Sequence, residues 1–170
     1  MALRRESPYR GRRLRLDEAL FERLAMSQLG LWYVLHLAPR IDKIVIPRTN
    51  GRLSSIGLDA VGLLTASGAK SGLPRTQPVG FIDDGNGLLA IGSNYGRPAH
   101  PGWSANLLAH PECTVVFKGP AREYKAELLT GDERAKAWAT AVDFYAGFQR
   151  YRTSCAPREI RVFRLRPVTA

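Results

Sequence analysis

From residue 60 to residue 167 the sequence keeps one pattern, in which short apolar runs are separated by Gly, Pro, Asn and Asp. This pattern is typical of a sheet or barrel and not of a helical bundle. It predicts strands at residues 60–66, 77–83 and 88–93, and three more in the stretches "CTVVFKG", "AREYKAELL" and "REIRVFRLRP". A chain of about six strands joined by tight turns is therefore expected.

The turns and helices of this region are marked as clearly as its strands. "DDGNG" at residues 83–87 predicts a hairpin turn, because Gly and Asn tolerate positive φ, and Gly119 with Pro120 predicts a second one. "HPGWSANLLAHP" and "TGDERAKAWATAVDFYAGF" are predicted to form two short helices. The second helix begins with a capping-box spacing, Thr130 three residues before Glu133.

The N-terminal region has a different pattern. Residues 1–15 hold six Arg and one Glu and are predicted to be a basic flexible tail. Residues 16–38 are predicted to form one long amphipathic helix that ends near Pro39, because leucines recur there at steps of four and seven. This helix either packs its apolar stripe on the core or lies on an anionic lipid surface. Residues 47–55 are predicted to be a loop.

Length and charge limit the remaining interpretations. With 170 residues, of which 45% are hydrophobic, the chain is long enough for one domain, predicted at residues 16–170. Its net charge of +10, of which the tail contributes +5, favours an anionic partner or ligand.

The two cysteines and the apolar stretch at residues 24–38 bear on the compartment. Cys113 and Cys155 are far apart and form no C-x-x-C pair, so the sequence predicts reduced thiols and a cytoplasmic protein. The apolar stretch is too short to span a bilayer and lacks a cleavage site. We therefore predict neither a signal peptide nor a transmembrane helix.

Motifs for a built-in catalytic group are missing from the sequence. The three histidines lack metal-ligand spacing, and no nucleophile elbow, phosphate-binding P-loop or dinucleotide-binding glycine motif is present. Such a chain is typical of a protein that uses the reactivity of a cofactor. In "SGAKSGLPRT" the glycines, the Ser71 hydroxyl and the cations Lys70 and Arg75 are suited to bind a phosphate. The alternative is an ordinary polar loop with two surface cations.

A second cluster, "SNYGRPAHPGWSANLLAHP", covers residues 93–111. Trp103 and Asn106 lie one helical turn apart there, so an aromatic face and an amide can address one ligand. Packing of Trp103 in the core is the competing interpretation.

Taken together, these stretches resemble the deazaflavin-dependent nitroreductase family. The resemblance rests on "T-x-x-G-x-K-S-G-x-P-R", "S-x-x-G-x-x-x-x-P-x-W-x-x-N-L-x-x-x-P", "LTG-x-E-R-A" and a final "R-x-I-x-V-x-x-L-x-P", and it covers residues 51–167. It implies an α+β fold, a mainly antiparallel split β-barrel with flanking helices. It also implies 8-hydroxy-5-deazaflavin, coenzyme F-420, as the cofactor.

The resemblance further implies roles for individual residues. The phosphate and oligoglutamate tail of the coenzyme would be bound by Lys70, Ser71, Gly72 and Arg75, and its ring end by Pro78, Ser93, Asn94, Pro101, Trp103 and Asn106. The reduced coenzyme would deliver a hydride to an electron-poor acceptor such as a quinone, a nitro compound or an activated enone.

The chain departs from the family pattern at three places. Ala69 stands where the family often has Arg, and Asn94 where some members have Lys. On the substrate side the resemblance points to Tyr145, Phe148 and Tyr151. Phe148 replaces a tyrosine, so a phenol that donates a proton is missing there, which argues against nitroreduction and leaves Tyr151 as the candidate proton donor.

Other interpretations stay open at this point. FMN is the alternative cofactor, as in split barrels of the pyridoxamine-phosphate-oxidase type. A non-enzymatic basic module that binds nucleic acid is disfavoured, because interleaved basic and aromatic motifs are missing. Residues 1–38 are predicted to contact the inner face of a membrane peripherally, and the chain is predicted to form a homodimer.

Overall fold

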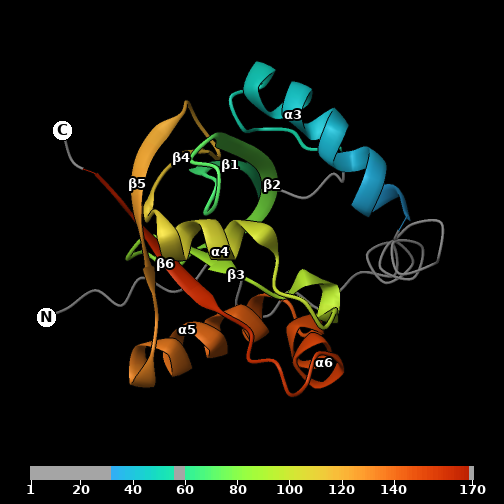
Figure 1. Cartoon of the computed structure of the whole chain (residues 1–170), viewed down its shortest axis with the longest axis vertical. Coiled ribbons are helices and arrows are strands. Elements are labelled where there is room, and N and C mark those ends of the chain that lie inside the picture. Colours follow the sequence, from blue (N-terminus) through green and yellow to red (C-terminus); the bar gives the residue numbers. More distant parts are fainter. Residues whose placement is uncertain (1–31, 56–59, 169–170) are drawn as a thin grey trace, which may run out of the picture.

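Six antiparallel strands form a closed barrel in the order β1-β2-β3-β6-β5-β4 (Figure 1). The computed structural model describes residues 32–55 and 60–168. The strands are β1 (Val61–Ser67), β2 (Pro74–Asp83), β3 (Leu88–Ile91), β4 (Glu112–Val116), β5 (Arg122–Leu128) and β6 (Val162–Pro167). The predicted α+β barrel of six strands is confirmed, and each predicted strand overlaps an observed one.

The barrel is covered by helices from three parts of the chain. These are η1 (Tyr33–Leu37) with α3 (Ala38–Arg48), then the short turn η2 (Asn94–Gly96) and α4 (Gly102–Ala109), and finally α5 (Gly131–Phe144) and α6 (Gly147–Ser154). In Figure 1, α4 crosses the face of the barrel, α3 lies beyond β2, and α5 and α6 lie on the opposite side from α3.

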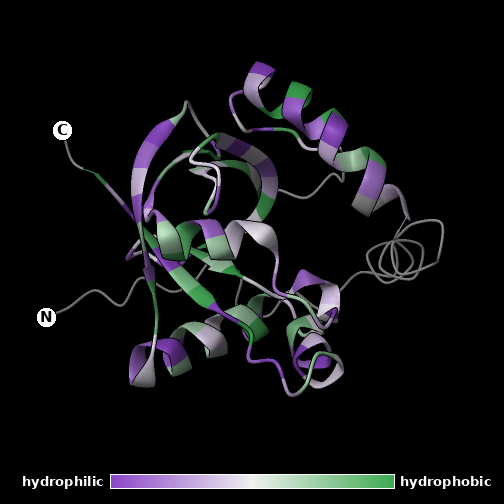
Figure 2. Cartoon of the chain, viewed as in Figure 1, coloured by the Kyte–Doolittle hydropathy of each residue, from purple (hydrophilic) through white to green (hydrophobic). Residues whose placement is uncertain are grey.

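Strand β3 shows how the alternation of side chains builds two apolar clusters. All four of its residues are buried, yet Leu88 and Ala90 lie inside the barrel and Leu89 and Ile91 lie in a second cluster under α5 and α6. Successive side chains of a strand point to opposite faces, so a strand covered on both faces is apolar throughout. Strand β5 has one buried residue, Ala126, and is mainly hydrophilic in Figure 2.

The N-terminal helix does not end where it was predicted to end. Helical backbone continues through Pro39 to Arg48, with Pro39 in the first turn of α3, directly after the π-helical segment η1. Proline is tolerated in a first helical turn because the N–H that it lacks has no partner there. The expected loop at residues 47–55 therefore begins only after Arg48. The tail at residues 1–15 and the helix predicted at residues 16–31 lie outside the described residues.

Two further expectations for the C-terminal half are corrected. Thr130 makes no side-chain capping hydrogen bond at the start of α5, and Glu133 instead pairs with Arg164 on β6 at 2.8 Å, so the predicted capping box is wrong. The helix predicted at residues 130–148 is also divided, because α5 ends at Phe144 and α6 begins at Gly147.

Helix α3 holds the segment that follows it through a buried acidic side chain. Ala38, Asp42 and Ile46 are buried at a spacing of four residues. The Asp42 carboxylate accepts a hydrogen bond from the Ser55 amide at 2.5 Å, which holds the segment after the helix. The helix is thereby attached through its buried stripe, and its other side faces solvent.

Candidate functional site

The loop between β1 and β2 is closed by two main-chain hydrogen bonds. The Gly68 amide donates to the Leu73 carbonyl at 2.9 Å, and the Gly72 amide donates to the Gly68 carbonyl at 2.8 Å. Gly72 has φ +66°, a conformation that favours glycine. This closure leaves Lys70 and Ser71 exposed at the tip of the loop.

An amide of this loop is held by Asn106. The side-chain oxygen of Asn106, on α4, accepts a hydrogen bond from the Ala69 amide at 3.0 Å across 37 residues of sequence. The two sequence clusters are therefore adjacent in space. Asn106 acts first as the residue that positions the loop against α4, a role that the sequence did not indicate.

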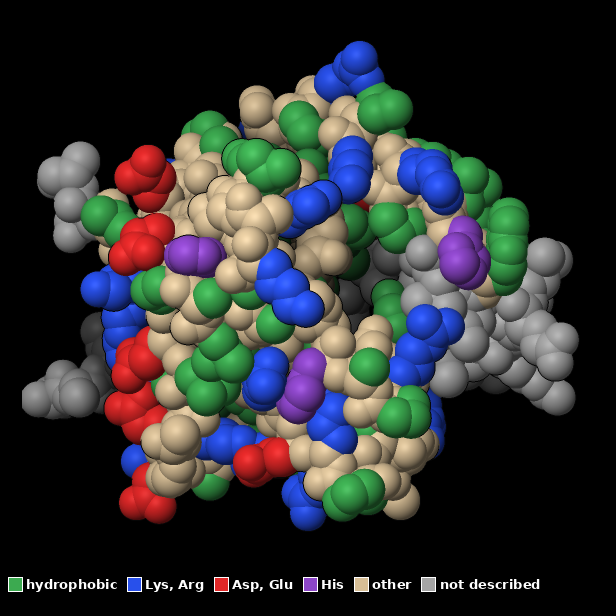
Figure 3. Space-filling model, in the orientation of Figure 1, with side chains coloured by type: hydrophobic (Ala, Val, Ile, Leu, Met, Phe, Trp, Pro, Cys, Tyr) green, Lys and Arg blue, Asp and Glu red, His purple; other side chains and the backbone are tan. Residues whose placement is uncertain are grey.

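The tip of the loop is suited to an anion. Within the described ranges, the amides of Lys70 and Ser71 donate to no acceptor, and no carboxylate lies within ion-pair distance of Lys70 or Arg75. Figure 3 shows Lys and Arg side chains following one another down the middle of this face, whereas most Asp and Glu side chains lie along its left side. Free amides beside unpaired cations form a typical phosphate or carboxylate site. A coenzyme with a phosphate and a carboxylate tail fits these residues.

Trp103 is a core residue. Its side chain is 7% exposed, and its ring centroid lies 5.7 Å from that of Phe163 inside the barrel. Pro101, which precedes α4, accepts two hydrogen bonds from Ser104 through its carbonyl. Pro78 is half-buried in β2 opposite Leu63. A contact of these three predicted site residues with the coenzyme stays a prediction.

The segment that follows β3 contains two residues in a left-handed conformation. Asn94 has φ +48° and Tyr95 has φ +55°. The Asn94 side-chain amide donates to the Ala99 carbonyl at 2.9 Å, so this side chain stabilises its own loop. Backbone strain of this kind persists only where the surroundings enforce it.

Arg158 binds the main chain on both sides of these two residues. Its guanidinium donates to the carbonyls of Ser93 at 2.7 Å, Gly92 at 3.1 Å and Arg97 at 2.9 and 3.1 Å. These partners lie 61 to 66 residues away in sequence. The motif that carried the family resemblance includes Arg158, but it gave no indication of this function.

The three residues predicted on the substrate side form one aromatic cluster. The ring of Phe148 lies 5.4 Å from that of Tyr145 and 6.3 Å from that of Tyr151, and the two tyrosine hydroxyls are 3.5 Å apart. Tyr95 packs edge-on against Tyr151 at 6.3 Å. Through Tyr95, this cluster touches the segment that contains Ser93 and Asn94. Burial, together with Tyr151, raises the pKa of Tyr95, so this phenol stays protonated near neutral pH.

Neither a thiolate nor a metal ion is supported as the reactive group. Burial raises the pKa of the Cys113 thiol to about 12, so the nucleophilic thiolate does not form near neutral pH. Among the described residues, no three His, Cys, Asp or Glu side chains come together as a metal site requires. The arrangement can bind an anion and place aromatic rings nearby, which suits a bound organic cofactor.

Comparison with known proteins identifies the family. A family model described as F420H(2)-dependent quinone reductase matches residues 40–167. The chain belongs to the F420H(2)-dependent quinone reductase family. It is 33% identical over 105 residues to Rv3178 of Mycobacterium tuberculosis, whose name assigns it to these quinone reductases. The match spans 62% of this chain and 87% of Rv3178.

Two solved structures are similar to this chain. An F420-H2 dependent reductase, FDR-A, matches with a TM-score of 0.57 and 32% identity over 62% of this chain and 93% of its own. A protein described as a domain-swapped dimer matches with a TM-score of 0.58 and 32% identity over 64% of this chain and 82% of its own. The predicted split-barrel fold and the predicted class of deazaflavin-dependent oxidoreductase are confirmed for this quinone reductase family member. The cofactor named for the family is coenzyme F-420 and not FMN.

Proposed function

We propose that the chain binds reduced coenzyme F-420 between the β1–β2 loop and the segment at residues 93–106, and that it reduces a quinone. When bound, the deazaflavin supplies a hydride, and the quinone takes up this hydride and a proton to give the hydroquinone. The observation that carries the proposal is the exposed loop with Lys70, Ser71 and Arg75, which Asn106 holds against α4 in a member of this family.

The residues of this chain serve binding and orientation. Lys70, Arg75 and the amides at the tip of the loop would hold the phosphate and the carboxylate tail. Arg158 would fix the segment with Ser93 and Asn94 that lies toward the ring. The protein thereby contributes position and electrostatics, and the hydride chemistry belongs to the coenzyme.

The aromatic cluster would border the quinone. Tyr151 is 8% exposed, with its hydroxyl near that of Tyr145, so its proposed function as proton donor stays a prediction. Nitro compounds stay less favoured acceptors, since Phe148 offers no phenol.

Coenzyme binding tests the proposal directly. The oxidised coenzyme is titrated with protein while its fluorescence is followed, and its reduced form is then mixed with protein and menadione. Quenching with a dissociation constant in the micromolar range and reoxidation that depends on the quinone are expected. In the double variant Lys70→Ala, Arg75→Ala we expect about 30-fold weaker binding, because two charge-assisted contacts of about 1 kcal/mol each are lost.

A matched double variant removes the same charge elsewhere. Arg122 and Lys125 are exposed on β5, and Arg122→Ala with Lys125→Ala should bind the coenzyme as the native protein does. Equal losses in both double variants would show that net charge, and not the loop, governs binding.

A homodimer is also proposed. The domain-swapped dimer to which the chain is similar supports it, and light scattering of the purified protein measures it.

We further propose that the N-terminal region contacts an anionic membrane surface, where quinones with apolar chains dissolve. Among the described residues, no helix is long and apolar enough to cross a bilayer.

The solvent side of η1 and α3 nevertheless exposes large apolar side chains, with Trp32 at 55%, Leu37 at 40% and Ile44 at 54%. Arg40, Lys43 and Arg48 lie beside them, and Figure 3 shows this mixture of blue and green at its upper right. Apolar and basic side chains on one helix are typical of an interfacial helix.

Flotation with vesicles measures this contact. The double variant Trp32→Ser, Ile44→Ser should float with phosphatidylglycerol vesicles at least about tenfold less, because two apolar anchors are lost. A truncation that removes residues 1–31 separates the contribution of the basic tail from that of α3. The control is the double variant Leu108→Ser, Val168→Ser, which removes two large exposed apolar side chains from elsewhere on the surface. Undiminished flotation of both the double variant and the truncation would disprove membrane contact through this region.

A further inference from the structure

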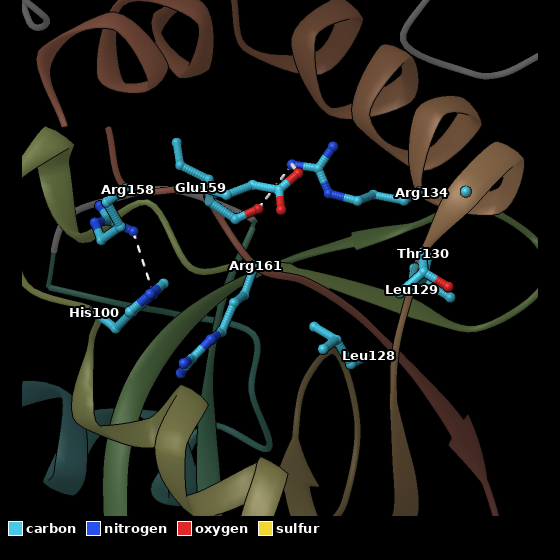
Figure 4. A pocket seen from close by; sticks show the side chains of 10 residues that line it. His100, Leu128, Leu129, Thr130, Arg134, Arg158, Glu159 and Arg161 are labelled. Carbon is cyan, nitrogen blue, oxygen red and sulfur yellow. Dashed lines mark hydrogen bonds and ion pairs between the residues drawn. The ribbon is translucent and has the colours of Figure 1, made fainter. Parts of the chain in front are cut away.

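A basic cavity lies on the other side of α4 from the β1–β2 loop. Its volume is about 380 Å³, and its lining includes His100, Leu128, Arg134, Arg158, Glu159 and Arg161 (Figure 4). This volume falls within the range of small-molecule pockets. Helix α4 separates the two sites, because its Asn106 holds the β1–β2 loop while its buried Ser104 accepts a hydrogen bond from Arg161 at 3.2 Å.

The charges in this cavity are not balanced. Arg134 pairs with Glu159 at 3.0 Å. The Arg158 side chain donates hydrogen bonds to main-chain carbonyls and to His100. Among the residues that the structure describes, the Arg161 side chain donates to the Ser104 hydroxyl alone. Within residues 32–55 and 60–168, no carboxylate lies within ion-pair distance of Arg158 or Arg161. Three arginines therefore face one glutamate, and two half-buried cations lack a counter-ion.

The state of His100 agrees with this excess of positive charge. Burial and the neighbouring cations Arg161 and Arg158 lower the pKa of His100. The imidazole is therefore neutral at neutral pH and adds no charge of its own. An anion beside Arg161 would offset the two guanidinium charges and raise the pKa of His100 again.

Part of the cavity lining is apolar. Leu128 is 39% exposed and lines the cavity (Figure 4), and the buried residues Leu129 and Ile160 line it as well. A guanidinium donates two parallel hydrogen bonds to a planar carboxylate. The lining thus matches a ligand that carries a carboxylate at one end and an apolar group at the other.

We propose that this cavity is a second binding site, which takes a small organic carboxylate with its charged end on Arg161 and its apolar part on Leu128. The site is separate from the one proposed for the coenzyme. It is connected to it, however, because Arg158 both lines the cavity and holds the carbonyls of Gly92 and Ser93. An occupant is expected to stabilise the segment at residues 92–101.

Benzoate is the probe, used with the full chain in the absence of coenzyme, so that the result does not depend on the proposed function. We expect saturable binding with a dissociation constant of about 1 mM, followed through the NMR signals of the histidine rings, with an upward shift of the His100 pKa. Benzamide, which has the same shape without the charge, should not bind. Arg161→Gln should weaken benzoate binding at least about tenfold, and Arg161→Lys should retain part of it.

Arg166→Gln is the matched control, since Arg166 lies on the exposed part of β6. It should bind benzoate as the native protein does. The proposal is overturned by any of three results: no saturation with benzoate, equal binding of benzoate and benzamide, or unchanged affinity in a folded Arg161→Gln. Binding of inorganic phosphate without binding of benzoate would also overturn it, because the site would then not recognise a carboxylate with an apolar body.

Discussion

Replacement of Arg158 by Met should weaken coenzyme binding about 100-fold while the barrel stays folded. The guanidinium holds the carbonyls of Gly92, Ser93 and Arg97, and it thereby fixes a segment in which Asn94 and Tyr95 adopt positive φ. Methionine has a similar length but donates no hydrogen bond. A loss of about 3 kcal/mol, a modest total for hydrogen bonds from a charged donor, corresponds to this factor. Fluorescence titration of the coenzyme measures it.

Two controls separate the hydrogen bonds from the charge. Arg158→Lys keeps the charge but loses the planar fork, so it should recover only a small part of the affinity. Arg122→Met removes an exposed arginine from β5 and should leave the affinity for the coenzyme unchanged. Coenzyme binding does not depend on the hydrogen bonds that Arg158 makes to residues 92–97 if Arg158→Met binds the coenzyme normally, or if Arg158→Lys restores full affinity.

Local sequence signals were sufficient for the strands of the barrel. Turn residues such as Gly85 and Gly87, both with positive φ, stand between apolar runs, and this punctuation predicts strands without knowledge of the partners. The predicted end of the N-terminal helix was wrong, because a proline after an apolar run can either end a helix or occupy the first turn of the next one. Pro39 occupies the first turn of α3, and only the packing of α3 on the barrel decides between these two positions.

The sequence also predicted some properties of the candidate site and not others. Lys70, Ser71 and Arg75 follow one another in a glycine-containing loop, so their exposure and charge could be read from a few adjacent residues. The functions of Asn106 and Arg158 could not, because each depends on partners from 37 to 66 residues away. For Trp103 the sequence offered both a ligand contact and core packing; the structure places its ring in the barrel core, and a contact with the coenzyme stays a prediction.

Replacement of Arg164 by Met should lower the free energy of unfolding by about 3 kcal/mol, which urea denaturation measures. Arg164 lies on β6 with 9% of its side chain exposed, and it pairs with Asp84 and with Glu133, each at 2.8 Å. Burial by itself would lower the pKa of Arg164, but its hydrogen bonds and its charge interactions with both carboxylates outweigh burial and raise it. Without the guanidinium, the Asp84 carboxylate, 10% exposed, loses its counter-ion.

The neighbouring Arg166 provides the matched control, because Arg166→Met changes the same residue type on the same strand. Its contact with Glu127 is 3.5 Å long and about half exposed on both sides, so the expected loss is at most about 0.5 kcal/mol. Adding Asp84→Asn to Arg164→Met should recover part of the lost stability, because the uncompensated charge disappears while the side-chain oxygen still accepts from the Asn86 amide. If Arg164→Met and Arg166→Met lower the free energy of unfolding equally, the Arg164–Asp84 pair between β6 and the β2–β3 hairpin contributes no more than a surface contact. The Arg164–Glu133 pair would then add nothing to the attachment of α5, which must be attributed to the apolar face of that helix alone.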